Sequence, residues 1–499
     1  MLMRKYLSKG LYAAIYGYLI LPFLIFSLGW LKIYIAIPIV LLLIICYFKI
    51  CKESTEVWLP QMTQDNIIKI LFIIAVIALW VYFSGIGKFV FQNTDHEARN
   101  GLFNILVTFD WPVVNYDVIQ SKMPGVSKSG LVYYIGFWLP SALIGKVFGL
   151  RIGYYAQALW ALIGISFVYY LICSKYRKIL VWPLGILILF SGLDIVGMFL
   201  IGNNIFQIPN TEHLEWWSTA YQYSSMTTQL FWVFNQAIPA WLCTMLAISQ
   251  KNNRNLVFIL ACCMLTSTFP FVGLLFIIVF LCLSRKYDIN PVLSRKIKAK
   301  KYFSALIKDT FTFQNIIGGG IVGITSFLYL MSNRSGMTVL SKEIEPVMKN
   351  NLEKYIIFLV VEIGVYVILL YHYNKKNLLY YYIILLLILI PPIHVGLSND
   401  FCMRASIPPL FILMLLFIDT TEKALQENNK AILGAVSIIV LIGSITPLHE
   451  LARTVTYTNI SVNQAEQVEE DDTSADILLS SDNFAGEAEN NIFWDYFIR

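Results

Sequence analysis

Apolar residues form long stretches along most of this chain, and short polar segments separate them. A helix needs about 20 such residues to cross a membrane at a rise of about 1.5 Å per residue. Stretches of suitable length are 11–30, 33–48, 67–84, 152–173, 179–200, 229–248, 314–331, 355–373, 378–393 and 431–446. The run 255–284 is interrupted by Thr266–Pro270 and predicts a hairpin of two short helices, and 406–418 is a further short candidate. The pattern predicts an all-α polytopic membrane protein with about 13 transmembrane helices.

The composition agrees with this prediction and excludes a soluble multidomain enzyme. Of the 499 residues, 58% are hydrophobic and 14% are charged, whereas soluble proteins average roughly 45–50% and 25%. The net charge of +6 is the modest excess that cytoplasmic loops normally carry, so it predicts no nucleic-acid site. Seven of the eight cysteines lie in or beside apolar stretches, which makes a disulfide framework improbable.

The distribution of Lys and Arg predicts the orientation. With a cytoplasmic N-terminus, most of the 37 basic residues fall in cytoplasmic loops, eight of them in 285–308. This requires that 131–149 does not cross the bilayer, so we expect it to be re-entrant or juxtamembrane. The residues after 446 then form an acidic external tail, 447–499. We therefore expect a transmembrane domain at 1–446 in a plasma (inner) membrane, with 84–150 as its first large external loop.

The external loop 84–150 opens with charged residues at a predicted helix start. Thr94 followed by Glu97 reads as a capping box, and Asp95 would also favour the first turn through the helix dipole. An apolar face suited to the membrane surface follows it. This face comprises Leu102, Phe103, Leu106 and Phe109. Helix initiation alone is therefore one interpretation of the acids, and catalysis is the other.

Three motifs in this part of the chain resemble the GT-C membrane glycosyltransferases, especially bacterial relatives of protein O-mannosyltransferases and of the aminoarabinose transferase. The motifs are the acids Asp95 and Glu97, then Trp111-Pro112, then a Lys before a Tyr-Tyr pair at 128–134. The resemblance covers roughly residues 70–180. The chain departs from the family where His96 separates the two acids and where Ser129-Gly130 replaces Pro-Pro.

The resemblance implies transfer of a sugar from a polyprenyl-phosphate donor to a glycan, lipid or protein acceptor at the outer face, with inversion. Asp95 would be the general base, with Glu97 and His96 as further catalytic candidates. Basic side chains would neutralise the departing phosphate. These candidates are Lys88, Arg99, Lys128 and Arg404. The alternative for Arg99 is a simple ion pair with Asp95. Tyr133 and Tyr134 would lie on the acceptor side.

A second external loop, 201–228, carries aromatic and acidic side chains of the kind that bind sugars. The candidates are Glu212, Glu215, Trp216 and Trp217. An interfacial tryptophan belt is the alternative interpretation. His213 lacks the spacing of a zinc site, so we predict no metal ligand. The sequence leaves a divalent cation open as a cofactor and indicates no other.

Two further polar positions stand out among the apolar stretches. Arg404 and Asp400 lie at a predicted outer mouth, 394–406, where they could contact a phosphate or simply pair with each other. Glu362 lies near the middle of a span, where an acid is either functional or a hydrogen-bonded structural group. Asn235 and Gln236 could bind ligand or join helices.

The rival functions are a transporter or flippase of lipid-linked saccharides, a polysaccharide polymerase or ligase, and a non-catalytic assembly protein. A transporter should show more paired charge within its spans, and a polymerase would rely on external Arg and His. The Ile-, Lys- and Asn-rich composition favours a bacterium with an AT-rich genome, in which the lipid carrier would be undecaprenyl phosphate.

Overall fold

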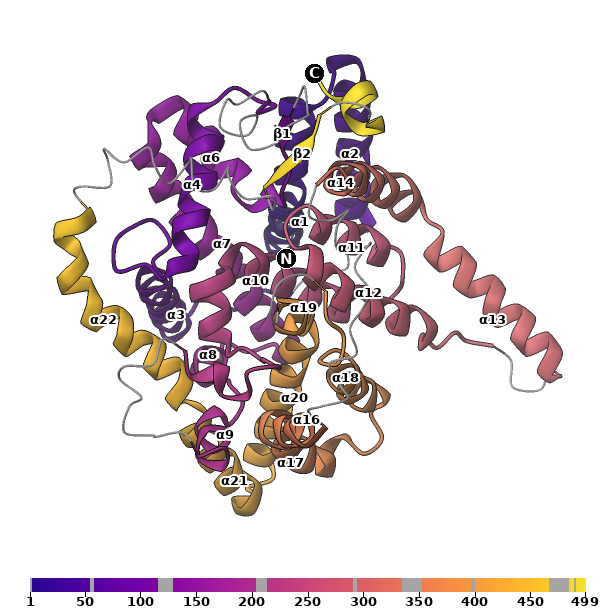
Figure 1. Cartoon of the computed structure of the whole chain (residues 1–499). Coiled ribbons are helices and arrows are strands. Elements are labelled where there is room, and N and C mark those ends of the chain that lie inside the picture. Colours follow the sequence, from indigo (N-terminus) through magenta and orange to yellow (C-terminus); the bar gives the residue numbers. More distant parts are fainter. Residues whose placement is uncertain are drawn as a thin grey trace.

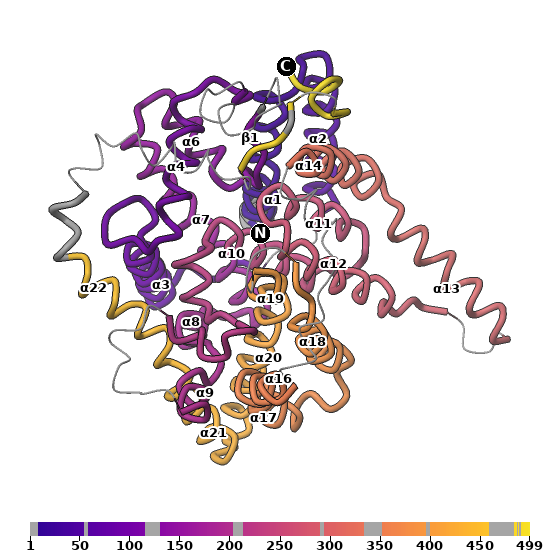
Figure 2. Tube along the Cα trace, in the orientation of Figure 1, coloured from indigo at the N-terminus to yellow at the C-terminus, as the bar shows by residue number. Residues whose placement is uncertain are grey.

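The computed structural model is mostly helical, and its helices follow the apolar stretches (Figures 1 and 2). It describes residues 2–53, 58–114, 129–202, 213–289, 294–333, 352–395, 400–465, 484–488 and 491–499. Within these residues, nine helical segments are long and apolar enough to cross a membrane. The prediction of an all-α polytopic membrane protein is confirmed. The predicted number of 13 spans is not, because several of the expected spans form shorter helices, among them α12 (Thr268–Leu283) and α18 (Leu378–Leu389).

The remaining elements of the bundle follow in chain order. They are α1 (Leu2–Trp30), α2 (Ile33–Glu53), α3 (Gln64–Phe83), α7 (Leu150–Tyr176), α8 (Trp182–Leu189), α9 (Asp194–Leu200), α10 (Met226–Ser249), α11 (Leu256–Met264), η4 (Gln314–Gly319), α14 (Gly320–Met331), α16 (Leu352–Leu359), η6 (Val360–Gly364), α17 (Val365–Asn374), α20 (Ile407–Gln426), α21 (Lys430–Gly443) and α22 (Ile445–Ala465). The predicted hairpin in 255–284 is present as α11 and α12.

Helix α10 forms the centre of the bundle and is buried along nearly all of its length. It packs against α7, α11, α12 and α20. Its Trp241 ring lies parallel to that of Trp80, 6.0 Å away, and near Phe411 of α20, 6.3 Å away. Helices α2 and α3, in contrast, expose many of their Ile and Leu side chains, as expected of helices that face lipid.

Helix α4 (Thr94–Thr108) packs its apolar face against other helices of the protein. Leu102, Phe103 and Leu106 are fully buried, and the helix packs against α7 and α6 (Leu139–Phe148). Its N-cap is Asn93, whose side-chain oxygen accepts from the Asp95 backbone N–H at 3.1 Å. The predicted capping box at Thr94 is therefore wrong, and the apolar face that we expected to contact the membrane packs against protein instead.

The segment 131–149 continues from β1 (Ser129–Leu131) into the short η1 (Ile135–Phe137) and then α6. The ten residues of α6 span about 15 Å at 1.5 Å per residue, half of a bilayer core. At Gly145, α6 lies so close to α7 that a Cβ on Gly153 would be 3.0 Å from the Gly145 Cα. The juxtamembrane or re-entrant placement of 131–149 stays a prediction.

The C-terminal end of the chain packs onto the bundle. Strand β2 (Ala485–Glu487) pairs antiparallel with β1, with Gly130 opposite Gly486. The following η8 (Phe493–Phe497) buries Phe493 and Trp494 beside α1. Helix α22 begins at Ile445 and continues through the predicted domain boundary at 446. The predicted acidic run 466–472 lies outside the described residues.

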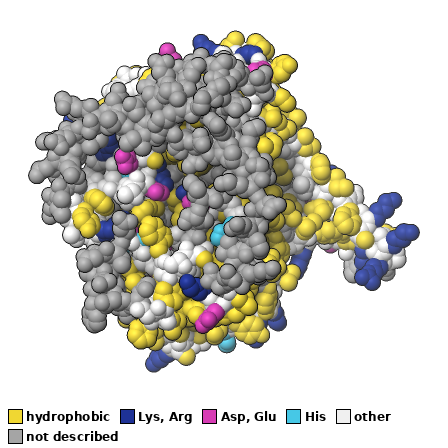
Figure 3. Space-filling view, viewed as in Figure 1, with side chains coloured by type: hydrophobic (Ala, Val, Ile, Leu, Met, Phe, Trp, Pro, Cys, Tyr) yellow, Lys and Arg dark blue, Asp and Glu magenta, His cyan; other side chains and the backbone are white. Residues whose placement is uncertain are grey.

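Helix α13 (Arg295–Thr310) extends away from the bundle, and its far end carries many basic side chains (Figures 1 and 3). None of its residues is buried. Two short elements complete the described fold. They are α19 (Asp400–Ala405) and η3 (Leu214–Ser218).

Candidate functional site

Asp95 lies in the first turn of α4 and is paired with Arg99 one turn later. The Arg99 Nη2 donates to Asp95 Oδ2 at 2.8 Å. The Asp95 side chain is 40% exposed, whereas that of Arg99 is only 11% exposed. The predicted ion pair is therefore present, and it holds a solvent-accessible carboxylate against a nearly buried cation.

A break in α10 fixes the position of this helix start. Val233 has non-helical φ and ψ of −137° and 37°, which interrupts the backbone hydrogen bonds of the helix there. The Phe231 carbonyl, just before the break, accepts from Asn93 Nδ2 and His96 Nε2, both at 2.9 Å. The sequence of α4 and the kink in α10 thus jointly determine where Asp95 lies.

His96 has a positioning role in this arrangement. Its Nε2 faces a carbonyl oxygen and must therefore carry the proton, and its Nδ1 lies 3.3 Å from Gln92 Nε2, from which it can accept. Burial, reinforced by the neighbouring Arg99, lowers the pKa of His96 to about 3. Because both nitrogens are engaged and the ring is buried, the expectation that His96 takes part in proton transfer is not supported by its surroundings.

The late segment of the chain brings a second arginine to the same place. Arg404 of α19 pairs with Asp400 at 3.0 Å, so the predicted self-pairing exists. Its Nη1 also donates to the Tyr134 hydroxyl at 3.4 Å, and Gln236 Nε2 donates to the same hydroxyl at 3.0 Å. The hydroxyl groups of Tyr133 and Tyr134 are hydrogen-bonded to each other. Of these two tyrosines, which we expected on the acceptor side, Tyr134 contacts the guanidinium of Arg404 directly and Tyr133 contacts Tyr134.

Several buried polar atoms around this cluster have no hydrogen-bond partner among the described residues. They are Arg99 Nη1, Arg404 Nε and Gln236 Oε1. A buried polar group without a partner costs about 1–3 kcal/mol. Such groups from three separate elements, gathered beside an exposed carboxylate, are the arrangement expected of a polar ligand site.

The surroundings of the cluster shift the pKa values of its two acids, Asp95 and Asp400, in opposite directions. Burial alone would raise the pKa of Asp95, but Arg99 and Arg404 outweigh that effect and hold the pKa below its ordinary value. Burial raises the pKa of Asp400, and the nearby charge of Asp95 adds to this against the opposing effect of Arg404. Asp95 is therefore the acid that is ionised most readily. Acidic and basic side chains gather between α4 and α19 on the near face in Figure 3.

A second polar cluster lies next to the first and contains residues that the sequence did not indicate. The buried His213 lies 3.7 Å from Glu215 and 3.9 Å from Glu450 of α22, and its ring stacks on Trp232 at 4.8 Å. Trp232 Nε1 donates to Glu450 at 2.9 Å, and Arg453 lies 3.5 Å from Glu450. The two clusters are linked through α10, because Trp232 directly follows Phe231, whose carbonyl accepts from Asn93 and His96.

The acidic and aromatic residues predicted to bind sugar take different places. Trp216 is 48% exposed and adjoins His213, so it is available to a ligand. Trp217 is buried and donates to Glu362 at 3.1 Å, and Glu215 is buried and accepts from Ser225 N at 2.8 Å. These two residues are internal packing groups, contrary to the prediction.

The remaining predicted site residues are Glu97, Lys88, Lys128 and Glu212. Glu97 is exposed on α4. Lys88 lies over the ring of Tyr154 of α7, 4.6 Å from its centre. Lys128 and Glu212 lie outside the described residues. In the described part of the chain, no group of three or more His, Cys, Asp or Glu is arranged to hold a metal ion.

The raised pKa of Glu215 leads to a testable prediction about how the stability of the protein depends on pH. Burial, with a contribution from Asp194, raises the pKa of Glu215 from 4.5 to about 8. The folded protein therefore binds a proton that the unfolded chain releases between pH 4.5 and 8, so stability falls as pH rises through this window. We expect the melting temperature of the wild type to fall more steeply from pH 5 to 8 than that of Glu215→Gln. Equal slopes would contradict a protonated Glu215.

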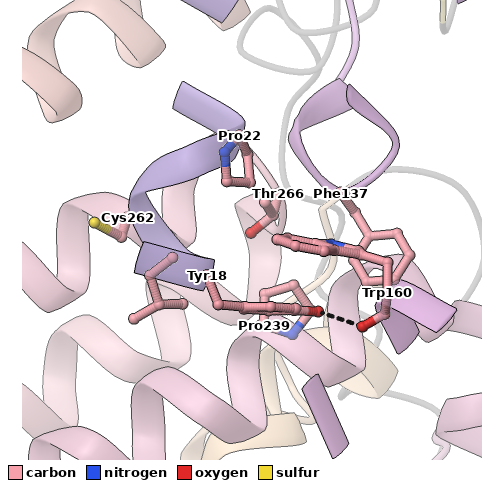
Figure 4. Close-up of a pocket in the computed structure, with 8 residues that line it drawn as sticks. Tyr18, Pro22, Phe137, Trp160, Pro239, Cys262 and Thr266 are labelled. Carbon is pink, nitrogen blue, oxygen red and sulfur yellow. Dashed lines mark hydrogen bonds between the residues drawn. The ribbon is translucent and has the colours of Figure 1, made fainter. Parts of the chain in front are cut away.

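Two cavities lie away from these clusters. One, of about 10 Å³, is lined by side chains of α1, α7, α10 and α11, with Tyr18 stacked on Trp160 at 3.9 Å (Figure 4). It has room for about one water molecule and cannot hold a sugar. The other, of about 460 Å³, is a polar hollow that includes Lys69, Arg177 and Lys178, all of them in segments predicted to be cytoplasmic.

No protein-family model, curated protein or solved structure matches this chain.

Proposed function

We propose that this protein is a membrane glycosyltransferase that moves a sugar from a polyprenyl-phosphate donor to an acceptor at the outer face of the membrane. The observation that carries the proposal is the pairing of Asp95 with Arg99, together with an Arg404 near enough for its charge to lower the pKa of Asp95. The two guanidinium groups keep buried N–H donors that have no partner in the described protein. An exposed carboxylate beside such donors matches a reaction that removes a proton and releases a phosphate.

In the proposed reaction, the acceptor hydroxyl attacks the anomeric carbon of the donor. The new carbon–oxygen bond forms as the bond to the phosphate oxygen breaks, and the configuration inverts. Asp95 takes the hydroxyl proton, and its Oδ1 serves because Oδ2 accepts from Arg99. The electron pair of the broken bond leaves with the phosphate, whose charge Arg99 and Arg404 offset.

Binding of the donor phosphate would also change the pKa of Asp95. In the free protein, Arg99 and Arg404 hold the pKa of Asp95 below its ordinary value. A bound phosphate shares the field of both arginines, so it raises the pKa of Asp95 at the moment when a proton acceptor is needed. Trp216, which is exposed beside the second cluster, would offer an aromatic face to the sugar or acceptor.

The test is transfer by the purified full-length protein in phospholipid vesicles. A panel of radiolabelled undecaprenyl-phosphate sugars is offered together with lipid and glycan acceptors. We expect at least one donor to be consumed and the label to appear in an acceptor. Binding of such donors without consumption across the whole panel would contradict the proposal, while movement of the label across the bilayer would favour transport.

A transporter of lipid-linked saccharides is the second candidate. The observation in its favour is that the acids Asp194 and Glu362, which the sequence places in separate spans, meet inside the bundle. Paired acids within spans are characteristic of transporters. The exposed position of Asp95 and the unpartnered donors beside it favour the enzyme.

A further inference from the structure

Two interruptions of membrane-spanning helices face each other inside the bundle. The span 182–200 is broken between the end of α8 at Leu189 and the start of α9 at Asp194. The span 352–374 contains the π-helical turn η6, a feature that is frequent at functional sites. The Tyr366 hydroxyl, two residues beyond the end of η6, donates to the Ser191 carbonyl in the break. The irregular parts of the two spans are thus joined.

Each interruption contributes one buried acid, and the two acids meet. Asp194 is 1% exposed and Glu362 is 3% exposed. Asp194 Oδ2 accepts from Ser191 Oγ at 3.0 Å and from Thr446 Oγ1 at 2.7 Å, and Glu362 Oε1 accepts from Trp217 Nε1 at 3.1 Å.

The second oxygen of each acid, Asp194 Oδ1 and Glu362 Oε2, has no donor among the described residues. The two carboxyl groups are close enough to hydrogen-bond to each other, which requires a proton between them. Two ionised carboxylates in contact repel strongly in a medium of low dielectric constant. The unpartnered oxygens therefore point to a bound proton.

The backbone between α8 and α9 leaves space for the carboxyl group of Glu362. A Cβ added to Gly192, in the break, would lie 1.6 Å from Glu362 Oε2. Only glycine allows the carboxyl group to reach this position. The close approach of Glu362 is therefore a feature of the local sequence, in which a glycine stands two residues before Asp194.

The surroundings favour a proton over a metal cation. The groups that contact the acids directly are N–H and O–H donors from Trp217, Ser191 and Thr446, and a donor hydrogen pointing at a carboxylate repels a cation. The other titratable groups that act on the pair are Glu215, Tyr223, Tyr366 and Cys402. None of these is a cation that could replace the proton.

We infer that Asp194 and Glu362 form an internal proton-binding site, in which one exchangeable proton holds the broken span α8–α9 against the π-helical turn of α16–α17. Loss of this proton would leave two carboxylates in contact and push the two spans apart. The site is separate from the proposed glycosyl transfer and would serve equally in an enzyme or a transporter. The protonation state of Asp194 and Glu362 would then control whether these two spans stay packed together.

The test is infrared difference spectroscopy of the full-length protein in lipid, in a Glu215→Gln background that removes the nearest other acid. At neutral pH we expect a carbonyl band of a protonated carboxylic acid that shifts when H2O is replaced by D2O. This band should disappear in Glu362→Gln and in Asp194→Asn. The matched control is Glu353→Gln, which removes an exposed acid from the same span and should leave the band unchanged.

Three results would overturn the inference: no protonated band at neutral pH in the Glu215→Gln protein, a band that survives both substitutions, or a band that sodium removes at constant pH. The last would identify a cation site. If Glu362→Gln or Asp194→Asn does not fold, the band and its D2O shift in the Glu215→Gln protein still decide the question. No substrate is used, so the result does not depend on whether the protein transfers a sugar.

Discussion

Replacement of Asp95 by Asn is expected to reduce glycosyl transfer by about 10²–10⁴-fold, the usual contribution of a general base. The Asn side chain has nearly the same shape, and its amide oxygen can still accept from Arg99. Its amide cannot take up the proton of the acceptor hydroxyl. We therefore expect kcat to fall while the KM for the donor changes little. Initial rates measured with varied donor concentration, on protein with an unchanged melting temperature, check this result.

The control for Asp95→Asn is Asp65→Asn. Asp65 forms an ion pair of the same spacing with Lys69 of α3, at 2.7 Å, and is 71% exposed. Its loss should leave transfer unchanged. A pH profile adds an independent readout, because the phosphate raises the pKa of Asp95 in the complex. The acidic limb of kcat should therefore lie at higher pH than that of kcat/KM. Transfer by Asp95→Asn at the wild-type rate would remove Asp95 from the mechanism.

The predictable part of this protein follows from long apolar runs and from charge. Each predicted span coincides with one or more helices, because about 20 consecutive apolar residues have few alternatives to a buried or lipid-facing helix. The sequence also directed attention to Asp95, Arg99 and Arg404, and these three lie together in the structure. They do so because Arg99 pairs with Asp95 one turn away on α4, while Tyr134 holds the guanidinium of Arg404.

The features that the sequence did not predict depend on contacts between distant segments. Glu450 and Arg453 follow the last apolar stretch, in the predicted acidic tail, yet α22 carries them back to the neighbourhood of His213. The amphipathic pattern of this helix was a signal that could have indicated a packed element. His96 resembles any loop histidine in sequence, and only the break at Val233 in α10 supplies the carbonyl that orients it.

Predictions from local sequence patterns were also wrong where the exact start of a helix or the direction of a side chain mattered. The pattern of Thr94 and Glu97 suggested a capping box, but Asn93 provides the cap, and Glu97 consequently lies beyond the third helical position. Trp217 and Glu215 have the side chains of a sugar site, and both are directed inward by contacts with Glu362 and Ser225. Residue type indicates the chemistry that is possible, whereas burial decides whether a ligand can reach it.

Replacement of Arg404 by Lys is the second prediction with a large expected effect. Lysine keeps the charge beside Asp400 but has no planar fork, so it cannot present the Nε donor that Arg404 leaves unpartnered. Loss of one charge-assisted hydrogen bond, about 1.5–3 kcal/mol, corresponds to roughly a 10- to 100-fold effect. We expect this effect on the KM for the donor, with kcat less affected. The control is Arg254→Lys, which alters an ion pair with Glu53 at 3.2 Å and should leave the KM unchanged.

A double-mutant cycle separates phosphate binding from the pairing of Arg404 with Asp400. If Arg404 serves only to neutralise Asp400, the Arg404→Lys effect should vanish in an Asp400→Asn background, because the acid is then uncharged. If Arg404 binds the donor phosphate, the effect should persist in that background, since the Nε donor is lost in either case. Persistence is the expected outcome, because Nε points to no group of the described protein while the terminal nitrogens already satisfy Asp400 and Tyr134.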